Sequence, residues 1–297
     1  MMSRTAALGD ASGPGLLRNR AALLAAALLA IAGLALGAAV AGPADAASAS
    51  VSTGKPDKPG KPGNGGGGTT GLEYAAVGDS FAAGTGAGSY IETTCYTSTK
   101  SYPKLLDADA NLRLVAFPAC SGASTATVIT SQVPAIPATA ARVTLTAGGN
   151  DVGFSSIMLN CFVFPWSSSC ESHIVNAETL VANGTVATNV ASTVQAIKAR
   201  SSVAKVVVTG YPLLFNEPSS YRWAARVNQG TAQLNAAIKG AAEANGAVFV
   251  DVTGAFAGHG IGSSSPWINP VGLSADAFHP NATGYAAYAA ATRPVIG

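Results

Sequence analysis

Five short apolar runs, each followed by residues typical of turns, alternate with helical patterns after residue 71, and this alternation constrains the fold most. The runs are rich in Val, Leu and Ala, and Gly, Pro, Asp or Thr closes each of them. They cover residues 72–77, 112–117, 142–147, 205–209 and 247–251. Strands buried on both faces of a parallel sheet have this continuous apolar character, whereas half-exposed strands alternate polar and apolar residues.

Helical patterns lie between these runs. The clearest covers residues 222–244, where apolar residues recur at near-helical spacing, and a weaker one covers 174–200 with an interruption at Asn183-Gly184. Strands that alternate with helices predict an α/β fold, here a three-layer α/β/α domain around a central five-stranded parallel sheet. In such sheets ligands bind at the carboxyl ends of the strands, so the loops that follow the strands are the expected place for a site.

The first 46 residues have the three parts of a secretory signal peptide. An uncharged apolar run over residues 21–41 precedes Ala44-Asp45-Ala46, which fits the small-x-small cleavage pattern. The basic residues before this run are Arg4, Arg18 and Arg20. A transmembrane anchor is the alternative, because the run approaches the roughly 20 residues that span a bilayer. The cleavage pattern favours removal, so we expect a secreted protein without stable membrane insertion.

Residues 47–71 are rich in Pro, Gly, Ser and Lys and cannot bury an apolar core, so they form a linker. The linker could hold the folded part away from the cell surface, and a solvated spacer without a function of its own is the alternative, so association with the cell surface stays open. One domain remains, residues 72–297, which we expect to act as a monomer. Because only 11% of the residues are charged and the formal net charge is +2, a dedicated nucleic-acid binder is excluded.

All four cysteines lie in the predicted domain. They are Cys95, Cys120, Cys161 and Cys170. An even number in an oxidising compartment predicts two disulfides, for which three pairings are possible. Short loops favour Cys95 with Cys120 and Cys161 with Cys170. The closely spaced cysteine pairs of a zinc site are missing from the sequence and it has only three histidines, so we expect neither a metal nor a cofactor.

A serine and a histidine far apart in the chain are the candidate reactive residues. Ser80 follows the first run in Gly78-Asp79-Ser80, which places a hydroxyl at the edge of the sheet. A serine hydroxyl is a poor nucleophile unless a base takes its proton. His279 lies three residues after Asp276, a spacing at which the carboxylate can hold Nδ1 and leave Nε2 free to face the serine. The alternative for Ser80 is a helix N-cap without chemistry.

Acyl transfer also needs hydrogen-bond donors directed at the oxyanion that develops during attack. Three candidates follow predicted strands: the backbone N–H of Ser80, the backbone N–H of Gly122 and the side-chain amide of Asn150. Gly122 permits close approach of the backbone, and Gly149 places Asn150 on a tight turn. Each of these residues alone is more often an ordinary turn residue.

These blocks together resemble the SGNH (GDSL) hydrolase family. Gly78-Asp79-Ser80, Gly122, Gly149-Asn150-Asp151 and Asp276-x-x-His279-Pro280 occur in the family's order, and the resemblance covers residues 72–293. The stretches that begin at Ser80 (SFAAGTGA) and at Ala119 (ACSGA) look most like secreted actinobacterial esterases and lipases.

The resemblance implies a role for each block. It implies Ser80 as nucleophile, His279 as base and acid, and an oxyanion hole formed by Ser80, Gly122 and Asn150. Some relatives hold the histidine with a backbone carbonyl instead of a carboxylate, so Asp276 and a carbonyl remain alternatives. The resemblance also supports the disulfide pairing with short loops.

The expected activity is hydrolysis of carboxylic esters through an acyl-enzyme, with a small-molecule or lipid ester as substrate. An apolar groove would favour acyl chains, although the same side chains could pack the core. The apolar residues near the predicted site loops are Phe81, Ile91, Phe154, Ile157, Phe162, Phe164 and Trp166. Carbohydrate O-acetyl esters and phospholipids are alternative substrates.

Three other interpretations are weaker. Residues 84–88 read Gly-Thr-Gly-Ala-Gly, but Ser89 stands where the dinucleotide fingerprint needs its third glycine. The Gly-x-Ser-x-Gly elbow of α/β-hydrolases fails because Ala82 takes its last position. A non-catalytic secreted binding module would explain export and disulfides but leaves the spacing of Ser80, Asn150 and His279 to coincidence.

Overall fold

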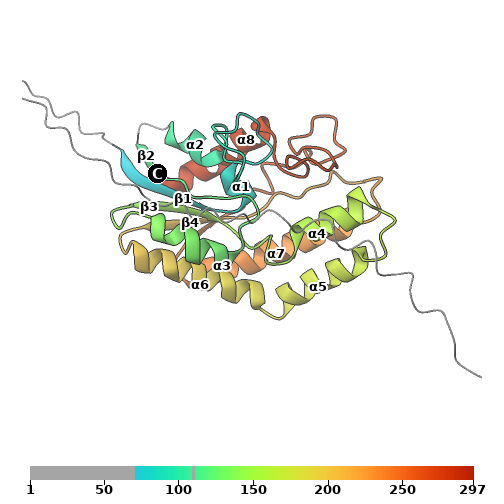
Figure 1. Cartoon of the computed structure of the whole chain (residues 1–297), viewed down its shortest axis with the longest axis horizontal. Helices are drawn as coiled ribbons and strands as arrows, with labels where there is room; N and C mark the ends of the chain where they lie inside the picture. The colour runs from blue at the N-terminus through green and yellow to red at the C-terminus, as the bar shows by residue number, and fades with distance from the viewer. Residues whose placement is uncertain (1–70, 109–110) are drawn as a thin grey trace, which may run out of the picture. The chain divides into compact units, whose positions relative to one another are not determined.

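The computed structural model of the chain describes residues 71–108 and 111–297 (Figure 1). The predicted signal peptide and all of the linker except Gly71 lie outside the described residues. Five parallel strands form one sheet in the order β2-β1-β3-β4-β5. The strands are β1 (Leu72–Gly78), β2 (Leu112–Ala116), β3 (Arg142–Thr146), β4 (Lys205–Thr209) and β5 (Val248–Val250). This confirms the predicted α/β fold with a central five-stranded parallel sheet.

The strand order decides where a site can form. The chain passes from β1 outward to β2, then returns to add β3 on the other side of β1, so the direction of winding reverses between β1 and β3. In an open α/β sheet the loops diverge at such a point and leave a crevice at the carboxyl ends of the strands. The segments after β1 and β3, which hold Ser80 and Asn150, therefore flank this crevice.

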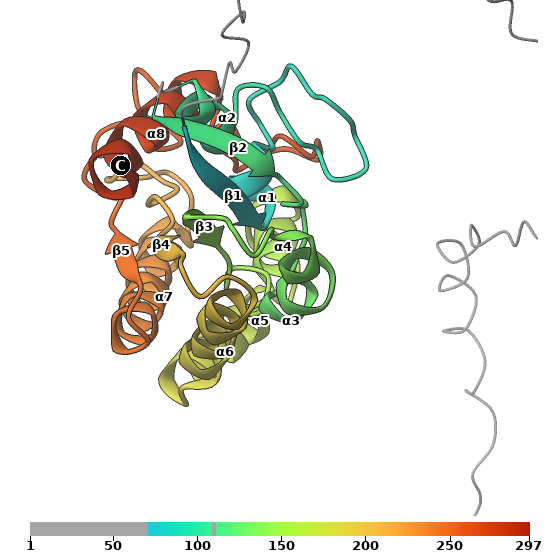
Figure 2. The same ribbon diagram turned by 90° about the vertical axis from the view of Figure 1, so that its left-hand side faces the viewer.

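Helices cover both faces of the sheet (Figures 1 and 2). α2 and α8 pack together on one face, whereas α5, α6 and α7 form the layer on the other. The helices are α1 (Ser80–Ala83), α2 (Tyr102–Asp107), α3 (Thr125–Thr127), α4 (Phe154–Met158), α5 (Cys170–Ala182), α6 (Thr185–Arg200), α7 (Ala224–Ala244) and α8 (Ala282–Ile296). Three shorter helical turns are η1 (Val128–Gln132), η2 (Val133–Ala135) and η3 (Leu159–Val163).

The predicted interruption at Asn183-Gly184 is the boundary between α5 and α6. Gly184 adopts φ +80°, a left-handed conformation that glycine takes without steric cost and that ends a helix. The weak helical pattern over residues 174–200 therefore reflects two helices with different buried faces. The predicted helix over 222–244 corresponds to α7.

Two disulfides join loops near the carboxyl end of the sheet. Cys95 pairs with Cys120 and Cys161 with Cys170, as the short loops favoured. The first ties the loop between α1 and α2 to the turn after β2, and the second closes the segment between η3 and α5. Both therefore fix segments that surround the crevice.

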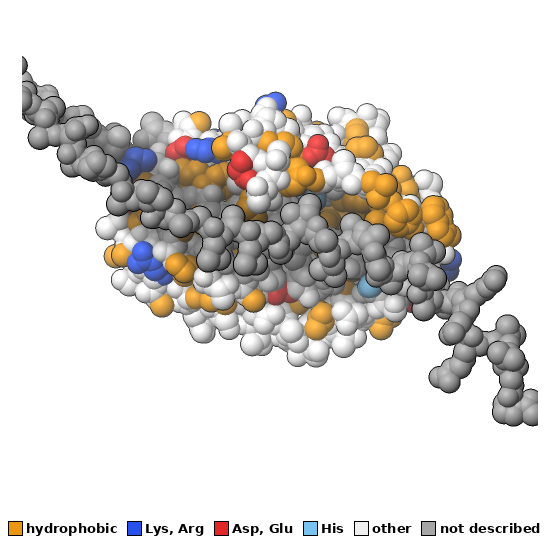
Figure 3. Space-filling view, viewed as in Figure 1, with side chains coloured by type: hydrophobic (Ala, Val, Ile, Leu, Met, Phe, Trp, Pro, Cys, Tyr) orange, Lys and Arg blue, Asp and Glu red, His pale blue; other side chains and the backbone are white. Residues whose placement is uncertain are grey.

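Most side chains that are visible on the face drawn in Figure 3 are uncharged. Hydrophobic side chains gather at the right-hand end of the view in Figure 3, where α4 lies in Figure 1. In the described parts of the chain, no helix combines the length and the apolar character that crossing a membrane requires.

A buried side-chain amide holds the end of β1. Gln132 Oε1 accepts a hydrogen bond from Gly78 N at 2.7 Å, and Gln132 Nε2 donates to Gly78 O at 2.9 Å. The amide thus pairs with the backbone as a neighbouring strand would, at the residue two positions before Ser80. Gly78 itself admits no side chain, because its φ is +137° and a Cβ would lie 2.2 Å from the Thr146 carbonyl oxygen.

Replacing this amide should cost stability. Gln132→Ala leaves the buried Gly78 N–H without its acceptor, so we expect the free energy of unfolding to fall by about 1–3 kcal/mol in urea denaturation. Ser131→Ala, at the exposed neighbouring position, should change it by less than about 0.5 kcal/mol. Equal effects of the two substitutions would contradict a specific role for the amide.

Candidate active site

Ser80 is the first residue of α1, directly after β1. The N-cap of that helix is Asp79, whose Oδ1 accepts a hydrogen bond from Phe81 N at 3.0 Å. The capping function that could have explained Ser80 therefore belongs to its neighbour, and the Ser80 hydroxyl is free for other contacts. The end of β1 brings this hydroxyl to the carboxyl edge of the sheet.

His279 approaches Ser80 from the last loop of the chain. The distance between His279 Nε2 and Ser80 Oγ is 2.8 Å. The imidazole is buried and lies against two aromatic rings, with centroid distances of 5.3 Å to Phe81 and 5.9 Å to Phe154. Phe278, the preceding residue, adopts φ +64°, which is costly for a bulky side chain and typical of sites where the fold imposes the conformation.

The partner of the other ring nitrogen is a backbone carbonyl. His279 Nδ1 lies 2.9 Å from Ala277 O. Because a carbonyl oxygen only accepts hydrogen bonds, the proton of the neutral imidazole is on Nδ1, and Nε2 is left to accept from the Ser80 hydroxyl. The geometry thus fixes one tautomer without a carboxylate.

Asp276 does not contact His279 Nδ1 in the structure, where the backbone carbonyl, the other alternative that the sequence left open, takes that place. Its Oδ1 accepts a hydrogen bond from the hydroxyl of Tyr90, which in turn accepts one from Gly86 N at 2.8 Å. The segment before His279 forms a turn closed by a hydrogen bond from His279 N to Asp276 O at 3.2 Å. In that turn the Ala277 carbonyl faces the ring, and the Asp276 carboxylate reaches the loop of Tyr90 instead.

Burial determines the charge of the histidine. Removal from water disfavours the imidazolium and lowers the pKa of His279 from 6.5 to about 4, against the hydrogen bond to Ala277 O, which raises it. The imidazole is therefore neutral at neutral pH. A neutral imidazole whose unprotonated Nε2 faces a hydroxyl is the arrangement that proton abstraction needs.

The other two donor candidates lie on loops that meet beside Ser80. The turn that carries Gly122 is held against the end of β1 by a hydrogen bond from Cys120 N to Gly78 O at 3.0 Å. Asn150 Nδ2 donates to Ala123 O at 3.0 Å, which joins the loop after β3 to this same turn. Gly122 has φ +82°, and a Cβ there would meet no atom within 4 Å, so the space beside its backbone is open.

A buried tyrosine that the sequence analysis did not select, Tyr211, connects the loop of Ser80 with the loop of Asn150. Tyr211 OH donates to Asp79 Oδ2 at 2.6 Å and accepts from Gly149 N at 3.0 Å. Burial raises the pKa of Asp79 to about 7, although the hydrogen bond from Tyr211 lowers it in part. In the sequence, the one sign that Tyr211 could belong to the site was its position after a predicted strand, in Gly210-Tyr211-Pro212.

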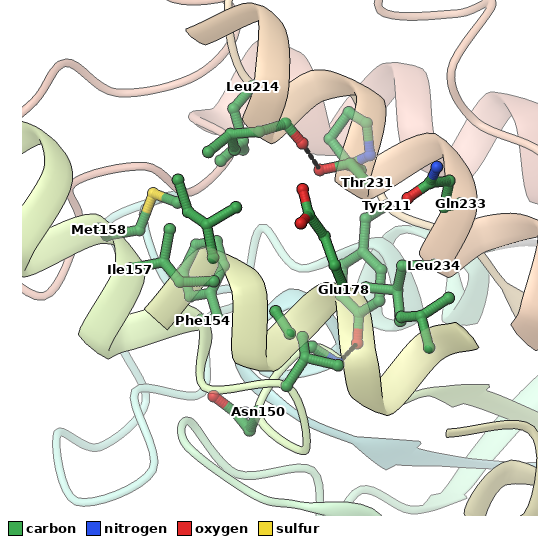
Figure 4. A pocket seen from close by; sticks show the side chains of 18 of the residues that line it. Asn150, Phe154, Ile157, Met158, Glu178, Tyr211, Leu214, Thr231, Gln233 and Leu234 are labelled. Atoms are coloured by element: carbon green, nitrogen blue, oxygen red, sulfur yellow. Dashed lines mark hydrogen bonds between the residues drawn. The ribbon is translucent and has the colours of Figure 1, made fainter. Parts of the chain in front are cut away.

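A pocket of about 800 Å³, including open space at its mouth, starts at Ser80 and Asn150 and runs between α4, α5 and α7 (Figure 4). Most of its lining is apolar. Side chains that supply this lining include Phe154, Ile157, Met158, Ile174, Leu214 and Leu234. Phe154 and Ile157, which the sequence could assign to either a groove or the core, thus line the pocket.

The outer part of the pocket carries one ion pair. Figure 4 shows Glu178 between the wall that carries Phe154 and Ile157 and the wall of α7. Its carboxylate binds Arg226 through two hydrogen bonds of 2.8 Å, from Nε and from Nη2. Among residues 71–108 and 111–297, no three His, Cys, Asp or Glu side chains gather in a group that could hold a metal ion.

Comparison of the chain with known proteins shows which family it belongs to. The model of the GDSL-like lipase/acylhydrolase family matches residues 76–287. A lipase of Streptomyces rimosus is 35% identical over 221 residues, which are 71% of this chain and 82% of that protein. Lipase 1 of Streptomyces coelicolor is 36% identical over 220 residues, 71% of this chain and 81% of that protein.

Solved structures agree with the sequence relatives. The extracellular lipase of Streptomyces rimosus superposes with a TM-score of 0.70 at 34% identity, over 75% of this chain and 99% of that one. Phospholipase A1 of Streptomyces albidoflavus superposes with a TM-score of 0.68 at 30% identity, over the same shares. The chain therefore belongs to the GDSL-like lipase/acylhydrolase family and is a carboxylic ester hydrolase.

Proposed function

We propose that this protein is a secreted serine esterase or lipase in which Ser80 is the nucleophile and His279 the base. The observation that carries the proposal is the 2.8 Å contact between Ser80 Oγ and His279 Nε2, with Nδ1 bound to a carbonyl. A non-catalytic binding module has no need of a buried neutral imidazole in this tautomer. Because Asp79 is the N-cap of α1, a capping role does not account for Ser80 either.

The reaction follows from this geometry. Ser80 Oγ attacks the ester carbonyl carbon while its proton moves to His279 Nε2. The oxyanion that forms accepts hydrogen bonds from Ser80 N, Gly122 N and Asn150 Nδ2. Collapse of the intermediate breaks the C–O bond, and the alcohol leaves with the proton from Nε2. A water molecule, deprotonated by the same nitrogen, then hydrolyses the acyl-enzyme and frees the acid and Ser80.

The pocket favours an acyl chain as the part of the substrate that the protein buries. Its walls between α4 and α7 carry apolar side chains, and each methylene placed there gains about 0.8 kcal/mol. The short acyl group of a carbohydrate O-acetyl ester would contact few of these apolar side chains. The phospholipase A1 relative supports a phospholipid as the second candidate, since its acyl chain would use the same pocket.

Secretion is part of the proposal. The predicted signal peptide, two disulfides and the extracellular lipase of Streptomyces rimosus among the relatives support it. Disulfides persist in oxidising compartments and are rare in the cytosol.

The first experiment expresses the whole chain, recovers it from the culture medium and assays p-nitrophenyl esters from acetyl to palmitoyl. We expect kcat/KM to rise from acetyl to medium chains and hydrolysis to be nearly lost in Ser80→Ala and His279→Ala. Asn150→Ala should lower kcat by about 10²–10³-fold, because one oxyanion donor is removed. The intact mass of the recovered protein should correspond to a chain that begins at Ala47.

Asn183→Ala serves as the control for Asn150→Ala, because Asn183 is exposed at the end of α5. It should leave kcat unchanged. Hydrolysis that survives in Ser80→Ala would overturn the mechanism. Protein that is folded but inactive on the whole ester series would instead favour the non-catalytic module.

Asp276→Asn tests which group orients the base. Because the Ala277 carbonyl binds Nδ1, we expect this variant to keep kcat within about tenfold of the parent, far above the loss in His279→Ala. Steady-state kinetics on one soluble ester is sufficient. A loss of about 10⁴-fold, typical of a triad that loses its carboxylate, would show that Asp276 acts on His279 directly.

The pH dependence of hydrolysis tests the pKa of His279. Only the neutral imidazole acts as a base, so activity is lost as pH falls through the pKa in the folded protein. With that pKa at about 4, kcat/KM should fall with a midpoint near 4 and not near the ordinary 6.5. A stopped assay from pH 3.5 to 9 measures this.

Asp79 provides the control for this profile. A decrease in activity near pH 7 would report its carboxyl group, whose pKa is about 7, and Asp79→Asn would remove that step. A midpoint near 6.5 that persists in Asp79→Asn would contradict the desolvated state of His279.

A further inference from the structure

We propose that exposed apolar side chains beside the His279 loop dock the protein onto an uncharged lipid–water interface. This inference rests on the proposed function, because it concerns how a lipid ester reaches the site. We call the set the apolar rim. Its members are Leu159, Phe164, Trp166, Tyr221 and Leu273.

The rim is unusually exposed for side chains of this size. Trp166 is 79% and Leu273 is 73% exposed to solvent. The ring centroids of Phe164 and Trp166 are 5.6 Å apart. Figure 3 shows hydrophobic side chains gathered at this end of the molecule, over α4 and the loops beside it. A group of exposed large apolar side chains marks a surface that meets a membrane or another protein.

The rim is continuous with the candidate active site. Buried Phe162 lies at its base, with ring centroids 6.0 Å from Tyr221 and 6.1 Å from Phe278, the residue before His279. Leu159 directly follows Met158, which lines the pocket beside Ser80. A molecule that contacts the rim is therefore next to both the histidine loop and the pocket wall.

The charges near the rim indicate which kind of lipid surface fits it, and Arg222, next to Tyr221, is an exposed basic residue beside the rim. The two segments that carry most of the rim, residues 152–170 and 252–275, contain no Lys, Arg, Asp or Glu. Binding to an anionic membrane depends on clustered basic residues, which these segments do not supply. Uncharged segments pay no cost for removing ions from water when they enter the boundary between headgroups and acyl chains. An interface of zwitterionic or neutral lipid therefore fits best.

The part of the rim between Cys161 and Cys170 is also constrained before it binds. The disulfide between Cys161 and Cys170 closes the loop that carries Phe164 and Trp166. A constrained loop loses less conformational entropy on binding than a free one. The five partly exposed side chains offer well under the roughly 800 Å² per partner that a stable dimer buries, whereas a few inserted side chains suffice for reversible lipid contact.

The test measures flotation with phosphatidylcholine vesicles in a Ser80→Ala background, so that no lipid is hydrolysed. We expect the Ser80→Ala protein to bind these vesicles. Adding Trp166→Ser together with Leu273→Ser should lower the partition coefficient at least about tenfold. Val203→Ser is the matched control, because Val203 is 64% exposed but precedes β4 at the opposite end of the strands. It should change partition by less than about twofold. All variants share the same N-terminal residues, so differences between them report the rim.

A second measurement uses the proteins with Ser80 intact. The pair Trp166→Ser with Leu273→Ser should keep kcat/KM on soluble p-nitrophenyl butyrate within about twofold, while hydrolysis of a long-chain ester held in phosphatidylcholine vesicles falls in proportion to partition. A loss on both substrates would mean that the substitutions damage the site and would overturn the docking role.

Three other results would also overturn the inference. The first is that the Ser80→Ala protein fails to bind phosphatidylcholine vesicles. The second is that it binds only to vesicles that contain anionic lipid. The third is that the protein sediments as a dimer and that the double substitution converts this dimer to a monomer. Vesicle binding by a protein that hydrolyses no ester would instead overturn the proposed function and leave the docking surface standing.

Discussion

The contact between Ser80 and His279 is the constraint on which the other features of the site depend. It joins two residues that are 199 positions apart, one at the end of the first strand and one in the last loop. The contact forms only if the sheet, the layer of α8 and the returning loop are all in place. The site is therefore a property of the complete domain. Tyr285 of α8 adds to it by donating hydrogen bonds to the carbonyls of Ser80 and Thr85.

Desolvation, and not a countercharge, sets the state of the histidine. The imidazole lies among aromatic rings with a carbonyl at Nδ1, and burial lowers its pKa to about 4. A carboxylate at Nδ1 would instead favour the imidazolium and raise the pKa. In this fold the hydrogen bond between Asp276 and Tyr90 ties the histidine turn to the loop between α1 and α2.

Neutral side-chain amides hold three of the buried loop residues around the crevice. Gln132 binds both backbone groups of Gly78, and Asn235 binds both backbone groups of Tyr211 at 2.8 Å each. Asn228 does the same for Phe215. Each amide gives a buried loop residue the donor and acceptor that a neighbouring strand would supply, which avoids the cost of burying ions. The low charge of this domain and its mainly apolar pocket are consistent with that solution.

The sequence by itself determined the features that depend on neighbours along the chain. These include the strands and their turns, the break at Gly184 and the short disulfide loops. They also include the order of the blocks that place Ser80, Gly122 and Asn150 after strands and His279 near the end of the chain. Only the tertiary structure decided that the Ala277 carbonyl faces Nδ1 and that Asp276 reaches Tyr90. It also decided that Tyr211 links two loops and that Trp166 faces outward where Phe162 is buried. The reason is that each of these contacts depends on backbone turns and side-chain directions that distant segments impose, and residue spacing carries no record of them.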